Sequence, residues 1–244
     1  MKDRIVLGQK LQIGDEVILE GPPLEAFRVQ RGRVGSIITL TDSAGTDFRG
    51  RVLRLSKEKA SVLLFEAFPS STESSLEIIL LQALPEKERM EWIIQKATEL
   101  GVSSIVPFKS QKSITLEERE SKQKKAHRWQ EIAIKAVQQS RRAKVPKIEK
   151  YRSFVEALEY CQEEGLKILL WEKEGESLRE VLKQDPLHRI YIMVGPEGGF
   201  TEDEVRMAEK KGFIPVKLGQ RILRTETAAI TLVGILQYTL GDLG

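Results

Sequence analysis

The sequence predicts a small β-rich domain followed by a larger α/β domain built on a parallel sheet. Three observations lead to this fold class. Short apolar runs separated by turn signals fill roughly the first 65 residues. A polar segment at residues 68–75 then interrupts the hydrophobic pattern. Beyond it, buried strand patterns alternate with helical patterns, which is typical of a parallel α/β sheet. We therefore expect domains at residues 1–70 and 76–244.

The first domain is expected to contain four short strands. Their apolar and polar residues alternate, and none of the segments is long enough for a stable helix. Gly14-Asp15 and residues 42–45 supply turn signals before and between them. Short strands at such spacing favour a small barrel. The expected strands are residues 16–20, 36–41, 48–54 and 60–65.

The second domain is expected to alternate five strands with capped helices. Pro85 and Glu86 open the first helix and Gly101 closes it. A later helix carries Trp129 on its apolar face, where a core role is favoured over base stacking. Capping boxes start helices after Ser153 and Thr201, and an apolar helix runs from Ala228 to about Leu240. The expected strands end near residues 81, 108, 171, 194 and 217.

Composition narrows the class of protein. The chain has 244 residues, 41% of them hydrophobic, and its apolar runs are far shorter than a membrane span. The N-terminus lacks the apolar region of a signal peptide. One cysteine and two histidines make a zinc site unconvincing. We expect a cytoplasmic protein without a metal or a membrane partner.

The net charge is only +3, but the basic residues are clustered. Residues 109–150 hold 13 Lys/Arg against 5 Asp/Glu, and residues 28–59 hold 8 against 3. A single basic cluster is as often a solvated surface, but two separate clusters favour a polyanion such as RNA. The candidate RNA contacts are Arg28, Arg31, Arg33, Arg49, Arg51, Gln139, Arg141 and Arg142.

A glycine-rich loop follows the strand that ends at Val194. Gly195, Gly198 and Gly199 allow the backbone to approach a ligand, and Pro196 stiffens the turn. The loop has neither the G-x-G-x-x-G spacing of dinucleotide sites nor a P-loop lysine. This favours a ligand without a polyphosphate, although a purely structural turn has the same composition.

A second loop, 23 residues further on, places a cation, a hydroxyl and an anion side by side at Arg224, Thr225 and Glu226. Parallel α/β sheets bind ligands at the carboxyl ends of their strands, so both loops can face one pocket. The alternative is that Thr225 or Thr227 merely caps the following helix, with Glu226 complementing its dipole.

Together these motifs closely resemble the RsmE family. The resemblance is carried by residues 195–200 and 218–228, and also by residues 96–102, Arg128-Trp129, residues 139–141 and residues 28–31. The family consists of SPOUT-superfamily methyltransferases that use S-adenosylmethionine to methylate N3 of a uridine in 16S ribosomal RNA.

The resemblance implies a PUA-like barrel followed by a SPOUT domain with a C-terminal trefoil knot. It also implies a homodimer, for which residues 230–236 are a candidate interface, although a core helix would look the same. The cofactor would lie among the loops after residues 171, 194 and 217. The implied S-adenosylmethionine contacts are Leu170, Glu172, Gly195, Pro196, Glu197, Gly198, Leu218, Gly219, Ile222, Leu223, Arg224, Thr225 and Ala228.

The expected chemistry needs a cation and a base. Uridine N3 carries a proton, and its loss leaves negative charge on the uracil oxygens, which Arg224 can stabilise. Glu226 and Glu197 are both candidate bases, and the sequence does not decide between them. Two rival functions remain: methylation of another RNA, such as tRNA, and a non-catalytic RNA-binding role. The N-terminal barrel and the sequence of the second loop argue against the first rival, and the intact Gly195–Gly199 and Arg224–Glu226 elements argue against the second.

Overall fold

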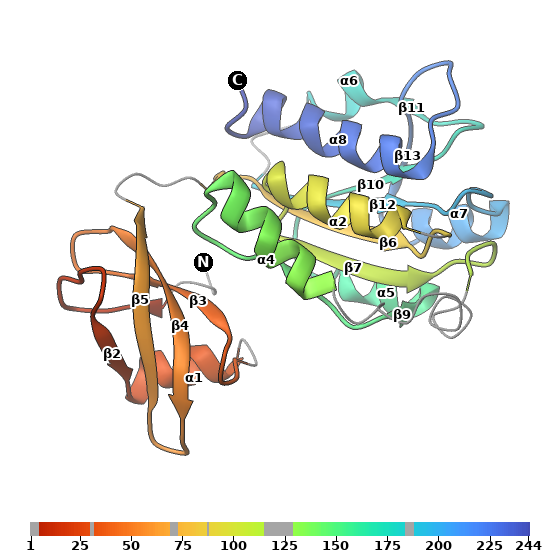
Figure 1. Cartoon of the computed structure of the whole chain (residues 1–244). Coiled ribbons are helices and arrows are strands. Elements are labelled where there is room, and N and C mark those ends of the chain that lie inside the picture. Colours follow the sequence, from red (N-terminus) through yellow and green to blue (C-terminus); the bar gives the residue numbers. More distant parts are fainter. Residues whose placement is uncertain (1–4, 30–31, 69–72, 87, 115–128, 184–187) are drawn as a thin grey trace. The chain divides into compact units, whose positions relative to one another are not determined.

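The computed structural model describes residues 5–29, 32–68, 73–86, 88–114, 129–183 and 188–244. The chain divides into two compact units (Figure 1). The first comprises residues 1–73 together with residues 140–145, and the second comprises residues 74–139 and 146–244. Residues 140–145 therefore group with the N-terminal unit, although their position in the sequence placed them in the expected second domain.

The first unit contains a five-stranded sheet in the order β1-β3-β4-β5-β2. β1 runs parallel to β3, and the other neighbours are antiparallel. The four expected strands are confirmed, and β4 and β5 are longer than expected. The strands are β1 (Ile5–Val6), β2 (Glu16–Leu19), β3 (Ile37–Thr41), β4 (Asp47–Leu55) and β5 (Ala60–Phe68).

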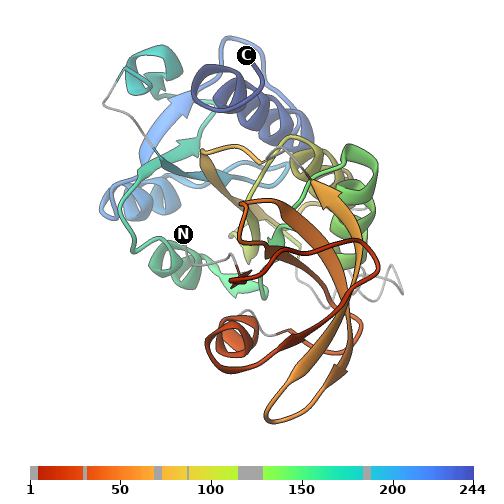
Figure 2. The same cartoon turned by 90° about the vertical axis from the view of Figure 1, so that its left-hand side faces the viewer.

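Helix α1 (Gly21–Val29) was not expected, because it begins with the sequence Gly-Pro-Pro, which resembles a turn. The helix lies beside the β4–β5 turn, where Arg28 donates a hydrogen bond to the carbonyl of Lys57 (Figure 2). Leu24 and Phe27 of α1 are buried with the inward-facing residues of the strands. This apolar contact explains how a segment with weak helix signals becomes a helix.

Residues 140–145 are fixed to the first unit by a buried ion pair and two further hydrogen bonds. Arg142 and Glu73 form the ion pair at 2.6 Å, with side chains only 6% and 7% exposed. The same carboxylate accepts the backbone N–H of Lys144, and the Thr39 hydroxyl donates to the carbonyl of Ala143. The contacts of Glu73 join segments about 70 residues apart in the sequence, and the hydrogen bond of Thr39 joins segments 104 residues apart.

The second unit is built on a parallel sheet in the order β11-β13-β10-β12-β6-β7-β8, with β9 also paired to β7. Every strand pair in it is parallel, which confirms the expected α/β class. The strands are β6 (Glu77–Ala83), β7 (Ser104–Lys109), β8 (Lys147–Ile148), β9 (Arg152–Ser153), β10 (Leu166–Leu170), β11 (Glu176–Ser177), β12 (Arg189–Val194) and β13 (Ile214–Lys217).

Helices cover both faces of this sheet. α5 and α7 share one hydrophobic core with residues of β6, β7, β10 and β12. α8 contacts β6, β12 and α2, and Figure 1 draws α2 and α4 in front of β7 with α5 behind it. The helices are α2 (Arg89–Glu99), α4 (Trp129–Ser140), α5 (Phe154–Tyr160), α6 (Leu178–Val181), α7 (Glu202–Glu209) and α8 (Thr225–Leu240).

The first residues of the helices can be compared with the predicted helix caps. Both capping boxes are confirmed, because Ser153 and Thr201 accept the expected backbone hydrogen bonds from Glu156 and Glu204. α2 begins at Arg89, a few residues later than Pro85 indicated, and α8 begins at Thr225, before Ala228. Trp129 is buried, as expected for a core residue. In the described parts of the chain, no helix has the length and apolarity to cross a bilayer.

Candidate active site

A cavity of about 480 Å³ opens at the carboxyl ends of β10, β12 and β13. Its walls come from the segments that follow these strands, as expected for an α/β sheet. All thirteen residues named above as implied cofactor contacts, from Leu170 to Ala228, line it. Eight further residues line it, among them Arg89 at the start of α2 and Trp171 after β10, to which the sequence reasoning gave no role in the site.

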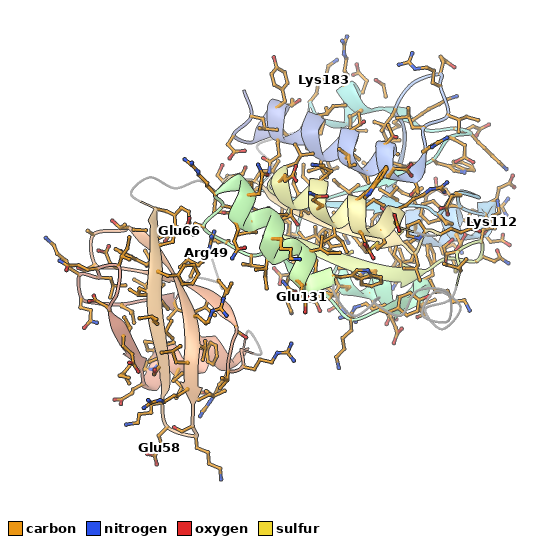
Figure 3. All side chains as sticks on the ribbon, in the orientation of Figure 1. Arg49, Glu58, Glu66, Lys112, Glu131 and Lys183 are labelled. Atoms are coloured by element: carbon orange, nitrogen blue, oxygen red, sulfur yellow. The ribbon has the colours of Figure 1, made fainter. Side chains whose placement is uncertain are left out.

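The loop after β12 forms one wall. Gly199 has φ +65°, a backbone conformation that favours glycine, and its N–H closes a turn onto the carbonyl of Pro196. A Cβ at Gly199 would lie 2.8 Å from Oε1 of Glu172, so the glycine also allows a close approach of β10's loop. Outside the cavity, Lys112 donates from Nζ to the carbonyl of Gly198 at 2.9 Å (Figure 3).

The loop after β13 forms another part of the wall and carries three apolar side chains. Ile222 is 83% exposed, while Leu218 and Leu223 are half-buried. Arg221 and Arg224 are exposed beside them. Exposed apolar side chains lining a cavity indicate a surface that a ligand can cover.

Thr225 links α8 by hydrogen bonds to the loop after β12 and to β6. Its hydroxyl donates to the carbonyl of Gly195 at 2.6 Å and accepts from Nε2 of Gln82 at 3.1 Å. The alternative that Thr225 caps the helix is therefore wrong, because the N-cap residue of α8 is Arg224. The side chain of Arg224 makes no capping hydrogen bond. Gln82, fully buried at the end of β6, gave no signal in the sequence beyond a polar residue ending an apolar strand.

The two candidate bases meet at Arg89. Glu197 accepts hydrogen bonds at Oε1 from the guanidinium of Arg89 and from the backbone N–H of Glu86. Oε2 of Glu226 lies 3.8 Å from Nε of Arg89, and the Glu226 side chain is only 10% exposed. Arg89 and Glu197 line the cavity wall. The sequence separates these three residues widely, so no motif predicted their contact.

The candidate RNA contacts differ in whether their side chains are exposed. The expected contacts with exposed side chains are Arg28, Arg33, Arg51, Gln139 and Arg141. Of these, Arg28 pairs with Glu25. Arg31 lies outside the described residues. Arg141 has φ +56°, which is uncommon for a residue other than glycine.

Two of the expected RNA contacts are corrected. Arg49 is fully buried and pairs with Glu66 on the neighbouring strand β5 (Figure 3). Burial lowers the pKa of the Arg49 guanidinium, and the carboxylate of Glu66 opposes this shift. Arg142 is buried in its pair with Glu73. Both guanidinium groups therefore bind carboxylates inside the first unit. The local sequence pattern around each arginine could not reveal these acidic partners.

Comparisons with known proteins agree with this geometry. Residues 72–237 match the family model described as an RNA methyltransferase domain. The chain is 32% identical to ribosomal RNA small subunit methyltransferase E of Bacillus subtilis, over 86% of this chain and 84% of that protein. The corresponding protein of Mesomycoplasma hyopneumoniae is 34% identical over 75% and 78% of the two chains.

Solved structures give the same result. The ribosomal RNA small subunit methyltransferase E of Neisseria gonorrhoeae, solved bound to S-adenosylmethionine, has a TM-score of 0.70 and 35% identity, covering 99% of each chain. A second relative, a Legionella pneumophila protein also solved in complex with S-adenosylmethionine, has a TM-score of 0.68 and 33% identity over 99% of each chain. The chain therefore belongs to the ribosomal RNA small subunit methyltransferase E family.

Proposed function

We propose that this protein transfers a methyl group from S-adenosylmethionine to N3 of a specific uridine in 16S ribosomal RNA of the small subunit. One observation carries the proposal: the thirteen residues implied as cofactor contacts line a single cavity at the carboxyl ends of three neighbouring parallel strands. Two relatives at 33% and 35% identity were solved with this cofactor bound.

The residues of the cavity suit S-adenosylmethionine. The volume of about 480 Å³ lies within the range of sites for small ligands. Leu218, Ile222 and Leu223 offer an apolar surface for the adenine ring, and Glu172 offers negative charge for a cation. When bound, the cofactor supplies an electrophilic methyl group on a positively charged sulfur.

The chain's own residues handle the proton and the charge of the uracil. Arg224 lines the cavity with an exposed side chain, where it can stabilise the negative charge that appears on the uracil oxygens. Glu197 and Glu226 are the carboxylates available to take the N3 proton. Because N3 lies on the pairing edge of the base, the target uridine must be unpaired or flipped out of its stack.

The finer features of the fold and assembly belong to the same proposal. We assign residues 1–70 to a PUA-like barrel that binds RNA through Arg28, Arg33 and Arg51, aided by Gln139 and Arg141. We assign residues 76–244 to a SPOUT domain with a trefoil knot. We also propose a cytoplasmic location and a homodimer; exposed apolar side chains on α2 and α8, namely Trp92, Ile235 and Tyr238, support the dimer.

Methyl transfer from labelled S-adenosylmethionine tests the proposal. Small subunits from cells that lack the modification should accept label, whereas tRNA should not. Arg224→Ala should abolish transfer, while Lys183→Ala, an exposed residue paired with Glu180 on α6, should leave it unchanged. Cofactor binding without transfer to any small-subunit particle would contradict the substrate assignment. Transfer to tRNA instead would favour the first rival.

A further inference from the structure

The cluster of Arg89, Glu197 and Glu226 joins the start of α2, the loop after β12 and the first turn of α8. Residues from three separate elements converge here on one guanidinium beside the cavity. The inference drawn from this cluster rests on the proposed methyl transfer and assigns different tasks to its members.

The two carboxylates have different environments. Glu197 is well satisfied, because its Oε1 accepts from the Arg89 guanidinium and from the Glu86 N–H at 2.9 Å. Oε2 of Glu226 is fully buried and accepts no hydrogen bond from the described residues. Its separation of 3.8 Å from Nε of Arg89 is an ion-pair distance but too long for a hydrogen bond. A buried carboxylate oxygen without a hydrogen bond lowers the stability of the folded protein, so its presence is best explained by a functional role.

The charge balance around Arg89 also distinguishes Glu226 from Glu197. One guanidinium faces two carboxylates, so one negative charge of the cluster remains unbalanced. Both donors of Glu197 bind its Oε1, whereas Oε2 of Glu226 is buried without a donor among the described residues, so the buried oxygen with free lone pairs belongs to Glu226. Glu226 does not line the cavity itself, but it follows the lining residue Thr225 and faces the lining residue Arg89, so its carboxylate can accept a proton through one water molecule.

We propose that Arg89 is a positioning residue that orients Glu226 as the proton acceptor and holds Glu197 as the anchor of the 195–199 loop. Through one water molecule, Glu226 takes the proton from N3 of the uridine. N3 then uses its electron pair to bond the methyl carbon, while the carbon–sulfur bond breaks and leaves its pair on sulfur. Glu226 returns the proton to solvent after the products leave.

This division predicts different kinetic effects for isosteric variants. Glu226→Gln should lower kcat by about 10²-fold or more and leave the Kd for S-adenosylmethionine within about twofold. Glu197→Gln should weaken cofactor binding about three- to tenfold, because the loop loses its anchor, with kcat within a few-fold of the wild type. Arg89→Gln should affect both quantities.

A double-mutant cycle tests the coupling. If Arg89 acts on kcat through Glu226, then Arg89→Gln combined with Glu226→Gln should be no slower than Glu226→Gln alone, within about threefold. Arg89→Lys should recover part of kcat, because an ammonium keeps the charge but cannot serve both carboxylates with a planar fork. If Arg89→Gln unfolds, Arg89→Lys combined with Glu226→Gln provides the same cycle.

The control is Arg206→Gln on α7. Arg206 also lies between two carboxylates, Glu202 at 3.6 Å and Asp203 at 3.8 Å, but on its own helix and outside the cavity wall. It should behave as the wild type. Multiplicative losses in the cycle, or a Glu197→Gln loss of kcat equal to that of Glu226→Gln, would overturn the inference. Absence of transfer by the wild-type protein would instead refute the proposed function itself.

Discussion

Thr225→Val should damage both stability and cofactor binding, because it removes a hydroxyl that two buried groups use. In the native protein the hydroxyl donates to the carbonyl of Gly195 and accepts from Gln82. Valine has nearly the same shape but can satisfy neither group. Gln82 keeps its bond to the carbonyl of Ala83, so the loss at Gln82 is partial.

The magnitude follows from these contacts. A buried polar group left without its partner costs about 1–3 kcal/mol. One fully orphaned carbonyl and one partly satisfied amide therefore predict a loss of about 2–4 kcal/mol in the free energy of unfolding. Because Gly195 lines the cavity, its loop should also loosen. We expect the Kd for S-adenosylmethionine to rise by about tenfold, which corresponds to about 1.4 kcal/mol.

Denaturant unfolding and calorimetric titration with S-adenosylmethionine measure the two effects. Thr225→Ser is the matched control, because it keeps the hydroxyl and loses one methyl group, worth about 0.8 kcal/mol. Equal losses in the valine and serine variants would refute the reasoning, since the methyl group and not the hydroxyl would then be responsible.

Three further predictions concern strain, a buried charge and a buried thiol. Gly199→Ala should lose about 1–2 kcal/mol of stability through its positive φ and should also weaken cofactor binding, whereas Gly212→Ala, with φ +83° and open space around it, should lose stability alone. Arg142→Met should cost about 3–5 kcal/mol in denaturant unfolding, because it removes the guanidinium that faces the buried carboxylate of Glu73, while Arg141→Met at the exposed neighbouring position should cost under about 0.5 kcal/mol. Burial raises the pKa of Cys161 from 9.0 to about 12; the unfolded thiol therefore ionises first, and this contribution to stability should fall between about pH 9 and 12. A thiol reagent at pH 8 should label Cys161 only on unfolding, and rapid labelling of the native protein would contradict its burial.

The parts of the fold that the sequence predicted are those with a strong local pattern. Apolar strands of the second unit read as continuous buried runs because helices cover both faces of a parallel sheet. The capping boxes at Ser153 and Thr201 were readable because each depends on residues three positions apart. Helix α1 was missed because its stability comes from burying Leu24 and Phe27 against strands distant in the sequence.

The residues of the cavity wall could be predicted from the sequence where they belong to a local motif. The glycine loop and the Arg224–Glu226 segment have local chemistry that can be read along the chain. Arg89 and Gln82 have none, since their roles arise from contacts with residues more than 100 positions away. The same limitation explains the errors at Arg49 and Arg142, where basic residues were read as surface charges. Their acidic partners become visible only once the first unit is folded.

The identity of the methylated nucleoside tests the central proposal most directly. Small subunits lacking the modification would be incubated with the protein and S-adenosylmethionine, and the RNA digested and analysed by mass spectrometry of its nucleosides. The account predicts 3-methyluridine at one position of 16S ribosomal RNA, formed by the wild type and about 10²-fold more slowly by Glu226→Gln. A methyl group on ribose, on another base, or on an RNA outside the small subunit would contradict it.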